Sequence, residues 1–123
     1  MQRKFRLTRS EDFKRVRRSG KSYAHPLVVL IVQTHDRQSN PADQPRVKVG
    51  VAAGRTVGTA VHRNRAKRLL REAVRTLLPH IASNLDLILI ARPGLVTATL
   101  EETRQALLNL LGRAHILIST NES

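Results

Sequence analysis

The sequence contains no cysteine and no tryptophan, only two phenylalanines and one tyrosine, and nine acids against 22 lysines and arginines. Without cysteine, neither a disulfide framework nor a thiolate metal site can form. No apolar run approaches the roughly 20 residues that a membrane-spanning helix needs. The charged first residues are not followed by the apolar stretch of a secretory signal. These absences predict a cytoplasmic protein that has no membrane partner.

The scarcity of acids also bears on catalysis. A metal-dependent nuclease needs several carboxylates that converge on divalent ions, whereas the nine acids of this chain are scattered along it. Glu72 most simply pairs with Arg65 or Arg68 on its own predicted helix. Four other acids fit the first turns of predicted helices: Glu11, Asp12, Glu101 and Glu102. The histidines have no metal-ligand spacing, and no phosphate-binding loop or nucleophile motif is present. We therefore predict no catalytic residue and no metal ligand in the protein.

The net charge of +13 is concentrated in two segments. Residues 1–21 hold nine lysines and arginines with two acids, and residues 46–75 hold nine with one acid. The rest of the chain is slightly acidic. Because a solvated surface normally mixes the two signs, two unmixed basic segments indicate a polyanionic partner, most simply a nucleic acid.

Local patterns in the first half of the chain predict a helix followed by strands. Ser10 can cap a helix that ends near Gly20. The β-branched run Leu27–Val32 is too short for a helix and predicts a buried strand. A polar loop at residues 35–45 follows, and Arg46–Val51 alternates as a strand with its valines toward the core.

The second half predicts helix, strand, helix, all within one domain of residues 1–123. A long central helix ends at Pro79, and Leu85–Ala91 is a further strand. Thr99 and Glu102 form a capping box for the last helix. Its core-facing stripe is predicted to contain six residues: Leu100, Ala106, Leu107, Leu110, Leu111 and Ala114. This order predicts an α+β fold. An α/β fold is the weaker alternative, because the early strands follow one another without a helix between them.

The central segment VHRNRAKRLLREAVR, residues 61–75, holds six lysines and arginines and one acid. At roughly 100° per residue, half of the helix circumference is apolar: Ala66, Leu69, Leu70, Ala73, Val74, Leu77 and Leu78. A neighbouring arc is polar and mostly basic: Arg63, Asn64, Lys67, Arg68, Arg71 and Arg75. Like charges four residues apart each destabilise a helix by a few tenths of a kcal/mol. A face that accepts this repulsion predicts a docking surface for a nucleic acid.

This segment resembles the signature of the protein subunit of bacterial ribonuclease P, which reads Gly-x-Ala-Val-x-Arg-Asn-Arg-x-Lys-Arg-x-x-Arg-Glu. Ten residues match it: Gly58, Ala60, Val61, Arg63, Asn64, Arg65, Lys67, Arg68, Arg71 and Glu72. LTRSEDFKRVRRSGK is similar to the N-terminal segment of the family, and RVKVGVAA and LILIARPG are similar to its strands.

The resemblance implies a two-layer α-β-β-β-α-β-α sandwich with a left-handed βαβ crossover. It also implies that the partners are the ribonuclease P RNA and precursor tRNA. The RNA subunit uses Mg²⁺, bound mainly by the RNA and the substrate, to hydrolyse the 5′ leader. The residues implied for RNA docking are Arg55, Arg63, Asn64, Arg65, Lys67, Arg68 and Arg71. In a cleft between the first helix and the sheet, the residues implied for leader binding are Phe13, Lys14, Arg17 and Lys48.

The chain departs from the family pattern at two places. Many members carry aromatic residues at the cleft positions that match Arg17, Val28 and Ile31, where this chain has none. Leader contacts should therefore rely on cations and on Phe13. The Ser-Lys-Lys that usually precedes the signature is Gly-Arg-Thr at residues 54–56, which leaves one cation fewer in that loop.

Two other functions are compatible with basic helices of this kind. One is a ribosomal-type structural RNA-binding protein. The other is a helix-turn-helix DNA-binding protein, which needs a second helix three or four residues from the basic one. The strand predicted at Leu85–Ala91 occupies that place, so we predict that DNA is not a partner.

Overall fold

The LDLILIA run forms an inner strand of a four-stranded sheet in the computed structural model, which describes residues 5–34, 47–82 and 84–118. The strands are β1 (Lys21–Ala24), β2 (Val28–Thr34), β3 (Val47–Ala53) and β4 (Leu85–Ala91). Their order is β1-β2-β4-β3, and all neighbours are antiparallel except β3 and β4, which are parallel. The predicted loop at residues 35–45 and the predicted first strand residue Arg46 lie outside the described residues.

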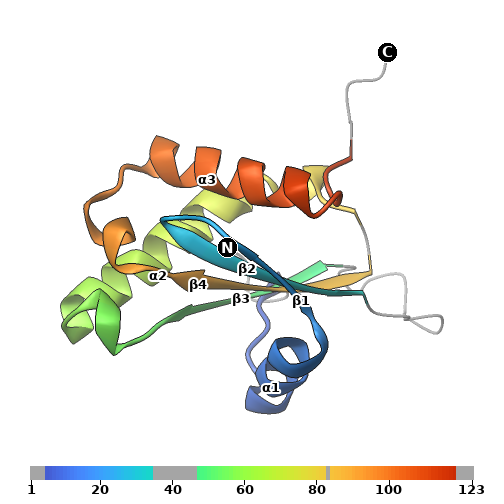
Figure 1. The fold of residues 1–123 in the computed structure, drawn as a ribbon, viewed down its shortest axis with the longest axis horizontal. Helices are drawn as coiled ribbons and strands as arrows, with labels where there is room; N and C mark the ends of the chain where they lie inside the picture. The colour runs from blue at the N-terminus through green and yellow to red at the C-terminus, as the bar shows by residue number, and fades with distance from the viewer. Residues whose placement is uncertain (1–4, 35–46, 83, 119–123) are drawn as a thin grey trace.

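Three α-helices cover the two faces of this sheet (Figure 1). They are α1 (Ser10–Ser19), α2 (Ala60–Arg75) and α3 (Leu100–Arg113), with short 3₁₀ turns η2 (Arg55–Val57), η3 (Leu78–His80) and η4 (Pro93–Thr97). In Figure 1, α2 and α3 lie above the sheet and α1 lies below it. The predicted α+β class is confirmed. The sheet and the two larger helices form the sandwich, and α1 adds a layer on the other face.

The sheet has an apolar core on each face, because side chains alternate along a strand. Leu87 and Leu89 of β4 belong to a large cluster with residues of α2 and α3. Ile88, between them, packs on the α1 face with a smaller set: Leu7, Val16 and Ile31. Val28 belongs to the large cluster and is fully buried. The expectation that Val28 lies in the cleft beside α1 is therefore wrong for this chain.

Strand β1 has no clear signal in the sequence. Its residues, KSYA, are mostly polar and exposed, so neither alternation nor an apolar run predicts a strand there. Pairing with β2 creates it, from Lys21 opposite Val32 to Ala24 opposite Val29. With β1 included, three strands precede α2, as the family resemblance implies.

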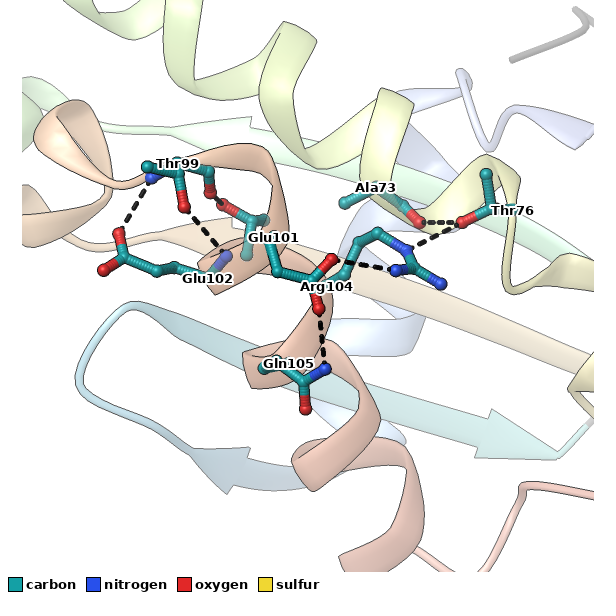
Figure 2. Close-up of polar contacts among 8 residues, drawn as sticks. Ala73, Thr76, Thr99, Glu101, Glu102, Arg104 and Gln105 are labelled. Carbon is teal, nitrogen blue, oxygen red and sulfur yellow. Dashed lines mark hydrogen bonds and ion pairs between the residues drawn. The ribbon is translucent and has the colours of Figure 1, made fainter.

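Two predicted helix ends differ from the structure. Ser10 is the first residue of α1, and the N-cap is Arg9, whose side chain makes no capping hydrogen bond. Helix α2 ends before Pro79, which lies inside η3. The residue after α2, Thr76, donates its hydroxyl hydrogen bond back to the carbonyl of Ala73 at 3.1 Å (Figure 2). That local bond closes the last turn without help from the proline.

The start of α3 confirms one prediction and corrects another. Thr99 and Glu102 form the predicted capping box, with reciprocal hydrogen bonds of 3.0 and 2.9 Å (Figure 2). Leu100, however, is 41% exposed and is not part of the core stripe. It lies beside Leu69 at the outer edge of α2.

The two parallel strands require a crossover connection, which α2 supplies. The register runs from Val47 opposite Leu85 to Ala53 opposite Ala91, and the left-handed sense of the crossover stays a prediction. The outer edge of β3 is covered by the N-terminal segment. There the N–H of Leu7 donates to the carbonyl of Val49 at 2.8 Å, and residue 6 forms a parallel bridge with Val49.

Gly20, between α1 and β1, should not tolerate a side chain. A Cβ at this position would lie 2.5 Å from the Val16 carbonyl, 2.7 Å from Ile31 Cγ2 and 2.9 Å from the Val32 carbonyl. We predict that Gly20→Ala lowers the free energy of unfolding by about 1–3 kcal/mol, measured by urea denaturation. Gly54→Ala is the matched control, because nothing lies within 4 Å of its Cβ. Equal losses in the two variants would contradict this explanation.

Candidate nucleic-acid interface

Helix α2 is oriented by its apolar face. Four residues of that face are buried, as predicted: Ala66, Leu70, Ala73 and Val74. Their burial sets the rotation of the helix, so its basic residues are turned outward. The helix begins after Gly58, whose φ of 133° favours glycine. Thr59 caps it by accepting a hydrogen bond from the His62 N–H at 3.4 Å.

A groove of about 400 Å³ runs along the outward face of α2. Its lining includes four of the seven residues implied for RNA docking, together with two others: Asn64, Lys67, Arg68 and Arg71, with Arg6 and Glu72. Arg6 comes from the N-terminal segment and reaches the groove because that segment extends the edge of β3. Sequence reasoning missed Arg6. The only signal was its place in the first basic segment, and nothing local shows which strand that segment joins.

The guanidinium groups in this groove repel one another. Partial burial, and secondly the charge of Arg6, lower the pKa of Arg71 below its ordinary value. The Nε of Arg6 is buried and has no hydrogen-bond partner within the described residues. Two cations held this close, one with an unpartnered donor, form a site suited to an anion.

The acid in the groove does not neutralise these cations. Glu72 bonds to Arg75 at 2.6 Å, one turn further along α2. The predicted pairing of Glu72 with Arg65 or Arg68 is therefore wrong. The Arg75 hydrogen bond lowers the pKa of Glu72, which keeps this carboxylate charged and engaged with Arg75. Both an i+3 and an i−4 partner are within reach on a helix, so spacing alone does not select one of them.

A second hollow, of about 200 Å³, adjoins the groove and shares Arg6 and Arg71 with it. Phe13 of α1 forms one wall and β3 forms the floor. The ring of Phe13 lies directly over Gly50, where any Cβ would overlap it. The two hollows therefore form one continuous surface, which runs from α1 across the edge of β3 to α2.

Helix α1 is held over the sheet by an ion pair whose carboxylate is buried and whose arginine is partly exposed. Arg15 bonds to the fully buried Asp86 of β4 at 2.8 Å and to Asp12 at 3.2 Å, and it also donates to Gln33. The hydrogen bond with Asp86 is the largest of the causes that raise the pKa of Arg15. A buried carboxylate that lost its cation would be strongly unfavourable, so this pair ties α1, and with it Phe13, to the sheet.

The other residues implied for leader binding lie near this surface without lining either hollow. Lys48 is half-buried and, two residues from Gly50 on β3, points to the α1 side of the sheet. Lys14 and Arg17 are exposed on α1. Their roles stay predictions.

Three residues implied for RNA docking also lie outside the groove. Arg55 is exposed in η2, ahead of α2. Arg63 is half-buried, and its Nε has no hydrogen-bond partner within the described residues. Arg65 is exposed further around α2, in an adjoining cleft that Leu100 also lines. The residues implied for RNA docking thus spread over several surfaces of α2 and over η2.

Other classes of site find little support in the described part of the chain. No three His, Asp or Glu side chains there lie close enough together to share a metal ion. None of the described helices is both long and apolar enough to span a bilayer. After α2 the described chain continues with η3 and then β4, so the second helix of a helix-turn-helix is not found there.

Comparison with known proteins gives a consistent result. The family model described as Ribonuclease P matches residues 1–115. A relative from Herpetosiphon aurantiacus, named ribonuclease P protein component, is 42% identical over 116 residues, which cover 94% of this chain and 89% of the relative. One from Chloroflexus aurantiacus with the same name is 37% identical over 125 residues, covering 100% and 87%.

Solved structures agree in fold. The RNase P protein of Staphylococcus aureus superposes with a TM-score of 0.76 at 26% identity, covering 92% of this chain and 97% of that one. The RNase P protein from Thermotoga maritima gives a TM-score of 0.72 at 28% identity, covering 88% and 96%.

The ion pair beneath α1 leads to a stability prediction. Arg15→Ala should lower the free energy of unfolding by about 1–3 kcal/mol, since it removes the charge-assisted hydrogen bond from Arg15 to the fully buried Asp86 carboxylate. Asp12→Ala removes only the partly exposed partner and should cost less than about 1 kcal/mol. Urea denaturation of both variants measures the difference. If Asp12→Ala proved as damaging as Arg15→Ala, the buried pair would not be what anchors α1.

Proposed function

The chain belongs to the ribonuclease P protein family, and from this membership we propose that it assists the removal of the 5′ leader from precursor tRNA. Its partners would be the ribonuclease P RNA and precursor tRNA, with no part for DNA or a membrane, and it would work in the cytoplasm. Hydrolysis would take place on the RNA subunit, with Mg²⁺ held mainly by that RNA and the substrate. No protein side chain is assigned a catalytic role.

The observation that carries this proposal is the groove shared by α2 and the N-terminal segment. Arg6, Arg68 and Arg71 offer planar guanidinium groups that can bind a phosphate through two hydrogen bonds. Lys67 adds a compact charge, and Asn64 can both donate and accept, as recognition of a base edge or a sugar hydroxyl requires. Because Glu72 is engaged by Arg75, the charge of the groove is available to an RNA backbone.

The adjoining hollow supports the leader part of the proposal. A single strand that passes over Arg6 and Arg71 would bring a base to the exposed part of the Phe13 ring. Stacking of a base on an aromatic ring contributes about 1–3 kcal/mol. Lys48 on β3, and Lys14 and Arg17 on α1, would attract the phosphates that follow. With only one aromatic residue in the hollow, leader affinity should depend more on charge than on stacking.

These contacts suggest how the protein helps an RNA catalyst. Each protein cation that neutralises a phosphate displaces a bound counterion. When protein cations neutralise the leader phosphates, fewer metal ions from solution are needed to screen the repulsion between the leader and the RNA subunit. The protein would therefore position the substrate and lower the Mg²⁺ demand of the complex, while the reacting groups stay on the RNA.

Reconstituted cleavage tests the function. We expect 5′-labelled precursor tRNA to be cleaved faster by the ribonuclease P RNA with the protein than without it, at a Mg²⁺ concentration too low for the RNA alone. A matched substrate with no leader extension beyond one nucleotide should gain less. If the protein gave no acceleration at any Mg²⁺ concentration, a ribosomal-type structural role would be the better explanation.

Salt dependence tests the groove. Arg6→Ala and Arg68→Ala should each weaken binding to the ribonuclease P RNA and reduce the slope of log K against log[salt] by about 0.7–0.9, since each removes one phosphate contact. Arg113→Ala is the control, because Arg113 bonds to the carbonyl of Ala24 at the opposite edge of the sheet. Unchanged slopes in both groove variants, or better competition by duplex DNA than by the RNA, would place the interface elsewhere.

A further inference from the structure

A further cleft on α2 adjoins the groove, shares Arg68 and Glu72 with it, and is more apolar. Its volume is about 260 Å³, and it is lined by Arg65, Arg68, Leu69, Glu72 and Leu100. Leu69 is half-buried and Leu100 is 41% exposed, so aliphatic carbon from two helices faces solvent between the arginines. Neither the charge pattern of the sequence nor the function proposed above accounts for this combination.

Exposed apolar side chains gather at this place. Only three large hydrophobic residues are exposed in the described part of the chain: Val61 at 74%, Leu100 at 41% and Ile118 at 47%. Leu100 lines the cleft, and Val61 precedes Arg65 by one turn on the same side of α2. Single exposed hydrophobic residues need no explanation, but two of these three lie beside Arg65, and such a grouping indicates a contact surface.

The acids around the cleft are already engaged. Glu72 bonds to Arg75, Glu101 receives hydrogen bonds from Arg104 and Gln105, and Glu102 closes the capping box (Figure 2). In contrast, Arg65 and Arg68 make no hydrogen bond or ion pair within the residues that the structure describes. The cleft therefore combines an apolar floor with two guanidinium groups whose donors are available.

We propose that this cleft receives one unpaired nucleobase of the RNA subunit. The base would pack on Leu69 and Leu100 while the Arg65 guanidinium stacks on it or bonds to its edge, as arginine planes do with unstacked RNA bases. Arg68 lines both this cleft and the groove, so it would hold the phosphate next to that base. The inference rests on the proposed function and adds a base-binding site to a surface otherwise recognised through phosphates.

The size and charge of the cleft favour a base over a protein segment. Pockets for drug-sized ligands span about 300–1,000 Å³, so a cleft of about 260 Å³ suits a single ring system. A peptide laid in it would need a longer apolar groove, with anchors spaced along a helix or strand. An RNA base also arrives with a phosphate, which matches the positive charge of Arg65 and Arg68.

Leu100→Ser tests the proposal by separating apolar contact from charge. We expect the variant to bind the ribonuclease P RNA roughly three- to tenfold more weakly with an unchanged salt slope, because no phosphate contact is lost. Arg68→Ala should both weaken binding and lower the slope, because Arg68 would hold the phosphate. Ile118→Ser, which removes a comparably exposed apolar side chain beside His80 at the other end of α2, should bind as the unchanged protein does. Circular dichroism and urea denaturation check that all three variants are folded.

The outcomes are distinguishable. If Leu100→Ser binds the RNA normally while Arg68→Ala is weakened, the base-binding cleft is wrong and the proposed function stands. If the unchanged protein fails to bind ribonuclease P RNA, the proposed function itself fails. If Leu100→Ser instead converts an oligomer of the free protein to a monomer on gel filtration, the cleft is a contact between protein chains and the proposal is overturned.

Cross-linking locates the base directly. The chain has no cysteine, so Leu100→Cys can carry a single photoreactive group without competing sites. We expect irradiation of the complex to join this group to one unpaired nucleotide of the RNA subunit, and the same group at Ile118→Cys to give no such product. Cross-links spread over base-paired nucleotides, or none at all, would contradict the inference.

Discussion

An inner strand that is apolar on both faces must be covered from both sides, and β4 imposes this requirement on the whole protein. Leu87 and Leu89 hold α2 and α3 on one face, while Ile88 holds α1 on the other. The one charged residue of the strand, Asp86, is fully buried and takes its cation from Arg15 of α1. The same strand thus sets the rotation of α2 and the position of α1, and these two helices carry most of the candidate interface.

The acids of this protein are few, and four of those in the helices serve their own helix. Asp12, Glu72 and Glu101 pair with an arginine three residues further on, and Glu102 closes the capping box of α3. What remains unmatched is a set of cations from two distant parts of the chain, brought together where Arg6 meets Arg71. The repulsion among these groups destabilises α2. The burial of its apolar face in the core offsets this cost, and that burial does not depend on charge. An RNA backbone would remove the repulsion, so binding and the stability of the basic face should be coupled.

Much of the fold and part of the candidate interface could be predicted from local sequence. The period of α2 identified its buried face, the capping box of α3 was recognisable from two residues, and the apolar run of β4 predicted an inner strand. The predictions that failed share one physical origin, which is that contacts between elements, or a choice between equivalent neighbours, decided the outcome. β1 is a polar strand that exists only through its pairing with β2. Glu72 had two partners within reach and its spacing favoured neither, and Leu100 fits a helical stripe but lies beyond the edge of the core.

The sequence by itself determined the class of the fold, the family, and which residues of α2 face outward, because each of these depends on periodicity or on a contiguous motif. Only the tertiary structure decided that Arg6 completes the groove, that Phe13 lies over Gly50, and that Arg65 faces an adjoining apolar cleft with Leu100. These contacts join segments far apart in the chain. They follow from strand register and from the packing of helices on the sheet, which are set by the burial of the whole core and are not encoded in any local stretch.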